Sequence, residues 1–358
     1  MLTPLLNEIL RSSADNKASD VILRSETPPL FRINGELFPV ECANPTDEDM
    51  DALWKACRAQ PADLDHDASL STESGERFRV NLHRQLGQRG AVLRRIRRDI
   101  PTMENLGAPA ELLSQWAKSK SGIIVIAGPT GSGKSTTMAA LLDSLNCSAS
   151  RHIVTIEDPV EYLFESQLSH FTQREVGIDT PTFAEGLRRS LRQNPDIIFL
   201  GEVRDRDSAS TALQASETGH LVLTTLHASN VKESIERMES LFAMEERGGI
   251  RKILSSQLLG VLCQRLPPST QGGRALVCEY FTNSGSARNL IAEGRSREIT
   301  ELFAKSDPRQ AKAFSTSLAE LLKSGILSEE TALEFSDNPQ DFARSLRGIS
   351  SAAQATRR

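Results

Sequence analysis

The spacing of hydrophobic positions changes near residue 100, and this change predicts two domains. Before it, short apolar runs alternate with polar turns, and helices are expected before residue 20 and near 47–59. Asn34-Gly35 lies between two of the runs and predicts a β-hairpin. The pattern predicts a small α+β domain over residues 1–99, with strands at 20–23, 30–33, 36–40, 77–81 and 91–96.

After residue 110 the apolar runs are continuous, which is typical of parallel strands buried on both faces of a sheet. These runs are 122–127, 152–157, 197–201 and 221–226. Residues 100–110 carry Pro and Gly and predict a linker. The remainder, 111–358, is predicted as an α/β domain with a helical C-terminal part, its helices near 231–241, 245–265, 285–293, 309–324 and 328–336. Residues 349–358 are small and polar and are expected to fray.

Composition narrows the function classes. The 358 residues carry 42 Lys and Arg against 47 Asp and Glu, a net charge of −5, which argues against binding nucleic acid or anionic membranes through bulk charge. No apolar run approaches the roughly 18–20 residues that span a bilayer, and the first residues lack the basic start of a signal peptide. The five cysteines form no C-x-x-C pair, so neither a disulfide framework nor a zinc site is predicted. We expect a reduced, cytoplasmic protein.

The strongest chemical signal is Gly128-Pro129-Thr130-Gly131-Ser132-Gly133-Lys134-Ser135. It fits the phosphate-loop pattern G-x-x-x-x-G-K-[ST], and it follows an apolar strand and precedes a helical run, as the pattern requires. Backbone N–H groups and the helix N-terminus would hold phosphates, Lys134 would reach the β- and γ-phosphates, and Ser135 would bind Mg²⁺. We predict a site for ATP and Mg²⁺ formed by Gly128, Thr130, Gly131, Ser132, Gly133, Lys134, Ser135 and Thr136.

Two acids end later strands of the predicted parallel sheet. Glu202 follows the strand 197–201, and because ligands bind at the carboxyl ends of such strands, it is placed to hold Mg²⁺ or its water. Glu157 ends the strand 152–157 and is a candidate to orient or deprotonate an attacking water. A surface acid is the alternative for Glu202, and a solvated acidic turn is the alternative for Glu157.

His220 and His227 bracket the strand 221–226, seven residues apart. The odd spacing puts their side chains on opposite faces of an extended strand, so we expect separate partners rather than a shared metal. Sensing of a γ-phosphate is the functional interpretation, and a structural histidine is the alternative for either one.

Arginines gather on two strands of the first domain, and in an acidic protein such a cluster points to an anionic partner. Arg79 and Arg94 are candidates to reach a triphosphate held by the neighbouring domain or subunit. For Arg95, Arg97 and Arg98 a solvated face is the alternative.

As a set, these motifs resemble those of a known family. The bacterial secretion ATPases of type II secretion and type IV pili carry a similar set, and within them the chain is most similar to the pilus retraction ATPases of twitching motility (the PilT and PilU subgroup). The resemblance covers residues 3–346 and rests on GPTGSGKSTT, TIEDPVEY, QREVG, LRRSLRQNPDIIFLGEVRD, ALQASETGHLVLTTLHASN and LLGVLCQRLPP.

The resemblance implies a PAS-like N-terminal domain, a RecA-like ATPase domain, and a homohexameric ring that holds ATP between the domains and at a subunit boundary. It implies Mg²⁺-dependent ATP hydrolysis. The implied site residues are Glu157 (the catalytic glutamate), Glu202 (the Walker B acid), His220 and His227 (the His box), and Arg79 and Arg94 (arginines that reach the phosphates from the N-terminal domain).

The implied function is a cytoplasmic motor at the inner membrane face of the pilus machine. It powers pilus retraction through an inner-membrane platform protein, and it meets the membrane through that partner only. A paralogous ATPase is a further expected partner, and no nucleic acid is expected to bind. The retraction subgroup carries A-I-R-N-L-I-R-E where this chain has Ser286–Glu293, with Ala292 in place of the second arginine. This departure leaves open an accessory PilU-like subunit. The ATPase of a related type II, type IV secretion or conjugation system is a further alternative, because such enzymes share the same core.

Overall fold

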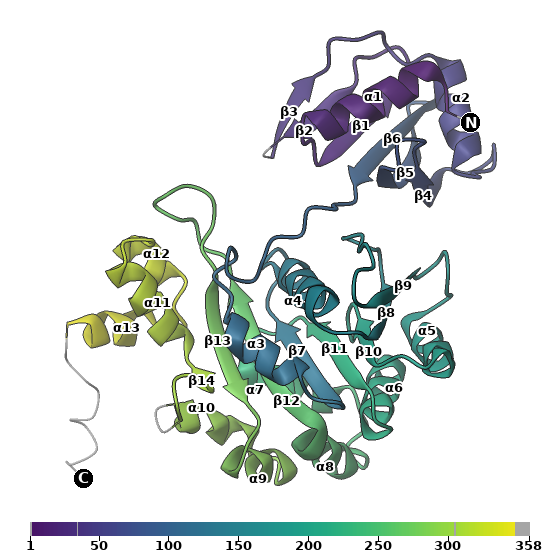
Figure 1. Ribbon diagram of the computed structural model, residues 1–358. Helices are drawn as coiled ribbons and strands as arrows, with labels where there is room; N and C mark the ends of the chain where they lie inside the picture. Colours follow the sequence, from purple (N-terminus) through teal and green to yellow (C-terminus); the bar gives the residue numbers. More distant parts are fainter. Residues whose placement is uncertain (1, 34, 304–305, 348–358) are drawn as a thin grey trace. The chain divides into compact units, whose positions relative to one another are not determined.

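The computed structural model describes residues 2–33, 35–303 and 306–347, and the chain forms two compact units (Figure 1). The first unit holds the residues up to Arg98 together with Pro159–Leu163, and the second holds Asp99–Asp158 and the chain from Phe164 onward. The polypeptide therefore passes between the units after residues 98, 158 and 163.

The first unit is an antiparallel sheet whose core face is covered by helices α1 (Pro4–Asp15) and α2 (Asp47–Ala56). The predicted hairpin is confirmed as β2–β3, and Asn34 of its turn lies outside the described residues. Strand β4 is an addition to the predicted strands. In sheet order the strands are β3 (Glu36–Pro39), β2 (Leu30–Ile33), β1 (Asp20–Arg24), β6 (Gln88–Arg95), β5 (Arg77–Gln85) and β4 (Asp65–Ser71).

The second unit is built on an eight-stranded sheet. Neighbouring strands from β12 to β9 run parallel, as the continuous apolar runs predict, and β13 and β14 complete one edge in antiparallel pairing. In sheet order they are β14 (Ala311–Lys312), β13 (Val277–Thr282), β12 (Leu258–Arg265), β7 (Gly122–Ala127), β11 (Leu221–Leu226), β10 (Ile197–Leu200), β8 (His152–Glu157) and β9 (His170–Glu175).

Helices cover both faces of this sheet and form two cores (Figure 1). One core holds α3 (Ala110–Ala117) and α4 (Lys134–Ser148). The other holds residues of α5 (Phe183–Ser190), α6 (Arg206–Glu217), α7 (Val231–Ser240), α8 (Arg247–Gln257), α9 (Ser286–Ala292), α10 (Ile299–Leu302), α11 (Phe314–Lys323), α12 (Glu329–Glu334) and α13 (Pro339–Leu346). Short 3₁₀ turns lie at Leu191–Gln193 and Ser296–Glu298.

The helix expected at 245–265 is wrong in its second half, because α8 ends at Gln257 and strand β12 follows beside β7. Continuous apolar runs suit a buried strand and a buried helix equally, so periodicity alone does not separate them. In the expected linker, Met103 is buried against α3 and α4. The tail 349–358 lies outside the described residues.

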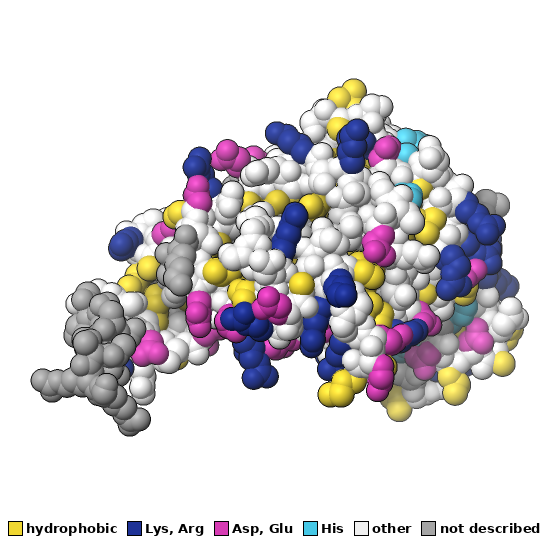
Figure 2. All heavy atoms as spheres, turned by 90° about the horizontal axis from the view of Figure 1, so that it is seen from below, with side chains coloured by type: hydrophobic (Ala, Val, Ile, Leu, Met, Phe, Trp, Pro, Cys, Tyr) yellow, Lys and Arg dark blue, Asp and Glu magenta, His cyan; other side chains and the backbone are white. Residues whose placement is uncertain are grey.

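On the face seen from below in Figure 2, Lys and Arg side chains and Asp and Glu side chains are scattered among neutral ones. This mixing agrees with the small net charge of −5. In the described part of the chain, no helix is both long enough and apolar enough to cross a membrane.

Candidate nucleotide site

A glycine-rich loop, 128–133, joins β7 to α4 at the carboxyl edge of the parallel strands. Gly128, Gly131 and Gly133 have φ angles of 152°, 79° and 86°, a backbone region that is open to glycine and strained for other residues. Helix α4 begins at Lys134 with no side-chain cap. Because the first N–H groups of a helix have no partner within it, this helix start offers donors to an anion.

The loop is closely packed at Gly128, and one of its buried hydroxyl groups suits a phosphate group. A Cβ atom at Gly128 would lie 2.4 Å from Ser132 Oγ and 2.6 Å from the carbonyl oxygen of Gln264, so a larger residue does not pack there. Ser132 Oγ is buried and has no hydrogen-bond partner among the described residues. A buried unpaired hydroxyl is costly, and a phosphate oxygen in the loop would pair with it.

Lys134 is the buried cation of the loop, with 9% of the residue exposed. Its Nζ donates to the carbonyl oxygens of Gly128 at 2.8 Å and Pro129 at 3.0 Å. A buried ammonium group needs acceptors or an anion nearby, so these carbonyl bonds hold the charge at the loop, where phosphates would bind.

The strand order decides which other side chains lie beside the loop. β11 is the neighbour of β7, β10 follows β11, and β8 follows β10. His227, Glu202 and Glu157 stand at or just after the ends of these three parallel strands. They therefore form a row along one edge that starts beside the phosphate loop, and residues predicted from separate motifs come together.

Glu202 has two cationic or titratable partners. Its Oε2 accepts a hydrogen bond from Arg204 Nε at 2.7 Å, and its Oε1 lies 3.3 Å from His227 Nε2. Arg204 also pairs with Asp158 Oδ2 at 3.2 Å, and the bond to Glu202 raises the pKa of Arg204. One guanidinium group thus joins the carboxylates that follow β10 and β8.

Glu157 is nearly buried, with 7% of the residue exposed. Its Oε1 accepts hydrogen bonds from Thr155 Oγ1 at 2.7 Å and from Gln173 Nε2 at 3.5 Å. Thr155 precedes Glu157 by two residues on β8, so both side chains project from the same face of the sheet. These donors orient the carboxylate that the sequence predicts as the catalytic base.

The family described as Type II/IV secretion system protein matches residues 1–322. The chain belongs to this family. It is 36% identical over 342 residues to the type IV pilus ATPase PilU of Pseudomonas aeruginosa. The matched region covers 94% of this chain and 89% of that protein. It is also 36% identical over 343 residues to the type IV pilus retraction ATPase PilT of the same organism, covering 94% of this chain and 99% of that protein.

A solved structure agrees with this assignment. The crystal structure of the pilus retraction motor PilT with bound ADP has a TM-score of 0.86 and 35% identity to this chain, and it covers 96% of this chain and 100% of that chain. The predicted α/β fold class and the predicted resemblance to secretion and pilus retraction ATPases are confirmed. The ADP in PilT is a ligand of the class predicted for the loop 128–135.

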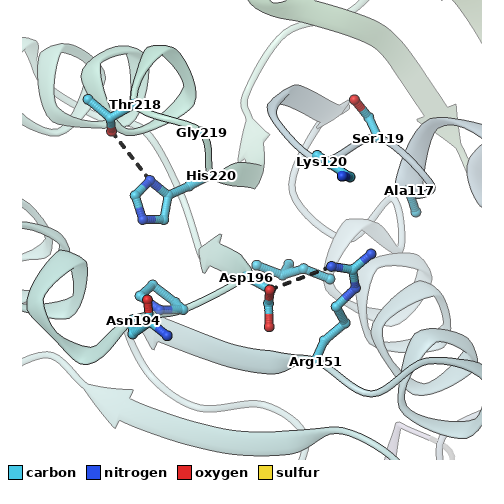
Figure 3. A pocket seen from close by; sticks show the side chains of 11 residues that line it. Ala117, Ser119, Lys120, Arg151, Asn194, Asp196, Thr218, Gly219 and His220 are labelled. Atoms are coloured by element: carbon cyan, nitrogen blue, oxygen red, sulfur yellow. Dashed lines mark hydrogen bonds and ion pairs between the residues drawn. The ribbon is translucent and has the colours of Figure 1, made fainter.

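His220 lies away from the row described above. It precedes β11 whereas His227 follows it, a separation of about 23 Å at ~3.3 Å per residue. His220 Nδ1 lies 3.1 Å from the carbonyl oxygen of Ala215, and its ring faces a cavity of about 390 Å³ at the amino edge of the strands, with Arg151 and Asp196 opposite (Figure 3). Each histidine therefore has its own partner, and the structure does not bring His220 to the loop. Its catalytic role stays a prediction.

Arg79 and Arg94 are direct neighbours in the first unit. They are cross-strand partners on β5 and β6, and their side chains project from the face opposite the core, because Phe78, Val80 and Leu93 fill the core. Arg94 Nε donates to Asp20 Oδ1 at 2.8 Å. The two arginines form one cationic patch, and their contact with a nucleotide stays a prediction.

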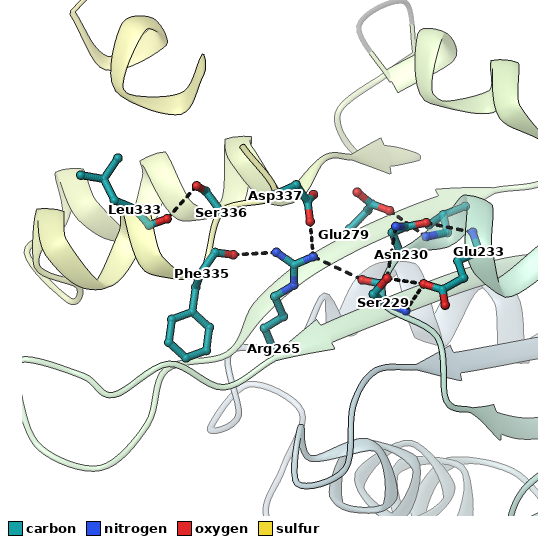
Figure 4. A network of polar contacts seen from close by, with 10 residues as sticks. Ser229, Asn230, Glu233, Arg265, Glu279, Leu333, Phe335, Ser336 and Asp337 are labelled. Atoms are coloured by element: carbon teal, nitrogen blue, oxygen red, sulfur yellow. Dashed lines mark hydrogen bonds and ion pairs between the residues drawn. The ribbon is translucent and has the colours of Figure 1, made fainter. Parts of the chain in front are cut away.

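A second polar network holds the loop that follows His227 (Figure 4). Arg265, the last residue of β12, donates to the carbonyl oxygens of Ser229 at 3.4 Å and Phe335 at 2.6 Å, and it also pairs with Asp337. Its side chain is only 14% exposed. Arg265 thus joins the His227 loop to the segment between α12 and α13.

Glu279 on β13 holds the other end of the same loop. The carboxylate is buried and accepts a hydrogen bond from the backbone N–H of Val231, the first residue of α7, at 2.8 Å. Burial raises the pKa of Glu279 to about 7. This buried acid thus binds the start of α7, four residues after His227.

The sequence did not single out Arg204, Gln173 or Arg265, although each contacts a predicted site residue or its loop. Their signal was present, since they stand in the motifs GEVRD, QREVG and CQRLPP. The strand order was missing, and only this order places Arg204 beside Asp158 and Gln173 beside Glu157.

Proposed function

We propose that this chain is an ATP-hydrolysing motor subunit that powers type IV pilus retraction. The observation that carries the proposal is the row of His227, Glu202 and Glu157 beside a glycine loop with an uncapped helix start and an unpaired buried hydroxyl, which suit a phosphate. It occurs in a chain that is 36% identical to a named pilus retraction ATPase over 94% of its length.

In this proposal the loop amides and Lys134 hold the ATP phosphates. Ser135 and Glu202 are the residues that would hold Mg²⁺, which when bound neutralises phosphate charge. Ser135 follows the loop lysine, and Glu202 stands at the strand end where a Walker B acid belongs. Glu157 orients and deprotonates the attacking water. His227, next to Glu202, senses the γ-phosphate.

The N-terminal arginines complete the site in this mechanism. We assign residues 1–99 to a PAS-like domain, 100–110 to a linker and 111–358 to a RecA-like ATPase domain. Arg79 and Arg94 close onto the phosphates, so that hydrolysis requires domain closure, and release of products reopens the site. A chemical step that depends on closure converts ATP turnover into movement between the domains.

We further propose a homohexamer in the cytoplasm, at the inner membrane face of the pilus machine. Sequential closure around the ring would act on an inner-membrane platform protein, through which alone the motor meets the membrane. A paralogous ATPase is a further partner, because chains named PilT and PilU both occur in Pseudomonas aeruginosa.

An accessory, PilU-like subunit is the second candidate, and Ala292 favours it. This residue replaces the second arginine of the retraction segment and is exposed at the end of α9, whereas Ala287 and Ile291 of the same helix are buried. The change therefore leaves the packing of α9 alone and alters what its exposed side offers to a partner.

Glu157→Gln tests the core of the proposal. The amide keeps the size of the side chain but does not accept a proton, and general-base catalysis contributes about 10²–10⁴-fold. We expect ATP binding within about threefold of the parent and turnover reduced by at least the lower bound of that range. Glu217→Gln, on an exposed residue at the end of α6, is the matched control. Parent turnover in Glu157→Gln would refute the assignment.

A further inference from the structure

Residues 159–163, directly after Glu157 and Asp158, belong to the first unit, although the residues before and after them belong to the second unit. Within the first unit, the backbone N–H of Arg97 donates to the carbonyl oxygen of Glu161 at 3.3 Å, and the N–H of Leu163 donates to the carbonyl oxygen of Arg97 at 3.0 Å. Residues 159–163 are therefore a short tether that the first unit holds, one residue away from the predicted catalytic acid.

The far end of the tether is fixed in the second unit by Phe164. Its ring stacks on Phe171 of β9 with centroids 4.3 Å apart. Its backbone N–H donates to Gln173 Oε1 at 3.0 Å. The first residue after the tether is thus bound to the side chain of Gln173.

Gln173 connects this point back to Glu157. β8 and β9 pair in parallel with Thr155 opposite Gln173, so the side chains of Thr155, Gln173 and Glu157 project from the same face of the sheet. Gln173 Nε2 donates to Glu157 Oε1 at 3.5 Å. A side-chain amide has one acceptor end and one donor end, and because the Phe164 N–H requires the acceptor, the donor end faces Glu157.

We propose that Gln173 is a positioning residue for ATP hydrolysis, which holds the Glu157 carboxylate and ties it to the tether 159–163. The inference rests on the proposed role of Glu157. In this arrangement Asp158 connects the tether to Glu157 along the chain, before the tether begins. Phe164 and Gln173 connect the other end of the tether to Glu157 through hydrogen bonds. Displacement of the tether with the first unit therefore moves the acid, which couples domain movement to the hydrolysis step.

Three variants of the full-length protein test the proposal. Gln173→Glu keeps an acceptor for Phe164 but removes the donor to Glu157, whereas Gln173→Met keeps the length of the side chain and removes both bonds. Gln271→Glu introduces the same charge on an exposed turn and serves as control. The measurements are kcat and KM for ATP, binding of a fluorescent ATP analogue, and the thermal midpoint of unfolding.

Because small displacements of a catalytic group cost about 10–100-fold in rate, we expect Gln173→Glu and Gln173→Met to lose at least the lower of these factors in kcat. We expect KM and analogue affinity within about threefold of the parent, since the phosphate loop is untouched. A merely structural role would lower the thermal midpoint and change KM together with kcat.

The proposal is overturned if both Gln173 variants keep the parent kcat, or if affinity falls and KM rises in step with the loss of kcat. Glu157→Gln separates this result from failure of the proposed function. An inactive Glu157→Gln variant beside fully active Gln173 variants refutes only the positioning role, whereas an active Glu157→Gln variant refutes the catalytic assignment on which it rests.

Discussion

Gly128→Ala gives the sharpest test of the phosphate-loop geometry. The added Cβ would lie 2.4 Å from Ser132 Oγ and 2.6 Å from the carbonyl oxygen of Gln264. The serine hydroxyl can rotate away, but the carbonyl belongs to the backbone of β12 and does not move without disturbing the sheet. Overpacking of this kind costs about 1–3 kcal/mol. A side chain at the positive φ of 152° adds about 1–2 kcal/mol, so we expect a loss of roughly 2–5 kcal/mol.

Gly272→Ala is the matched control for this experiment. Gly272 also has a positive φ, 88°, but an added Cβ there meets nothing within 4 Å, so only the backbone cost of about 1–2 kcal/mol applies. Free energies of unfolding from denaturant titration measure both losses, and a fluorescent ATP analogue measures binding. We expect Gly128→Ala to lose affinity and Gly272→Ala to keep it. Equal unfolding free energies with parent affinity in both variants would refute the packing argument.

Arg204→Ala removes the bridge between Glu202 and Asp158, so we expect steady-state turnover to fall by about tenfold or more. We expect a stability change under about 1 kcal/mol, because the side chain is 52% exposed. Arg206→Ala, 53% exposed and paired with Glu246, is the control, and equal turnover in both variants would contradict the role of Arg204. Burial raises the pKa of Glu279 from 4.5 to about 7, so the folded state binds this proton more tightly than the unfolded state. The free energy of unfolding should therefore fall by on the order of 3 kcal/mol as the pH rises from 4.5 to 7. Glu279→Gln should remove this part of the fall, and parallel pH profiles of variant and parent would show that the buried acid does not contribute.

The strands at the centre of the second unit could be predicted because they are buried on both faces. β7, β8, β10 and β11 appear in the sequence as continuous apolar runs, and the residues at their ends follow from the rule that ligands bind at the carboxyl edge of such sheets. The phosphate loop was predictable for a different reason, since its glycines and Lys134 stand at fixed spacing within one short segment.

The parts that escaped prediction depend on contacts between distant segments. β12 has the apolar content of a buried helix, and only its place beside β7 makes it a strand. Gln173 meets Glu157 because β9 pairs with β8, and Arg204 meets Asp158 because β10 lies next to β8. No single segment contains that strand order, so local pattern could not place these side chains.

The most direct test of the central claim is a count of surface pili in a strain that lacks this gene and in the same strain complemented with the parent gene or with Glu157→Gln. The account predicts excess surface pili and lost twitching in the deletion strain, recovery with the parent gene, and no recovery with Glu157→Gln. A bald or unchanged surface in the deletion strain, or full recovery with Glu157→Gln, would contradict a retraction motor driven by ATP hydrolysis at this site.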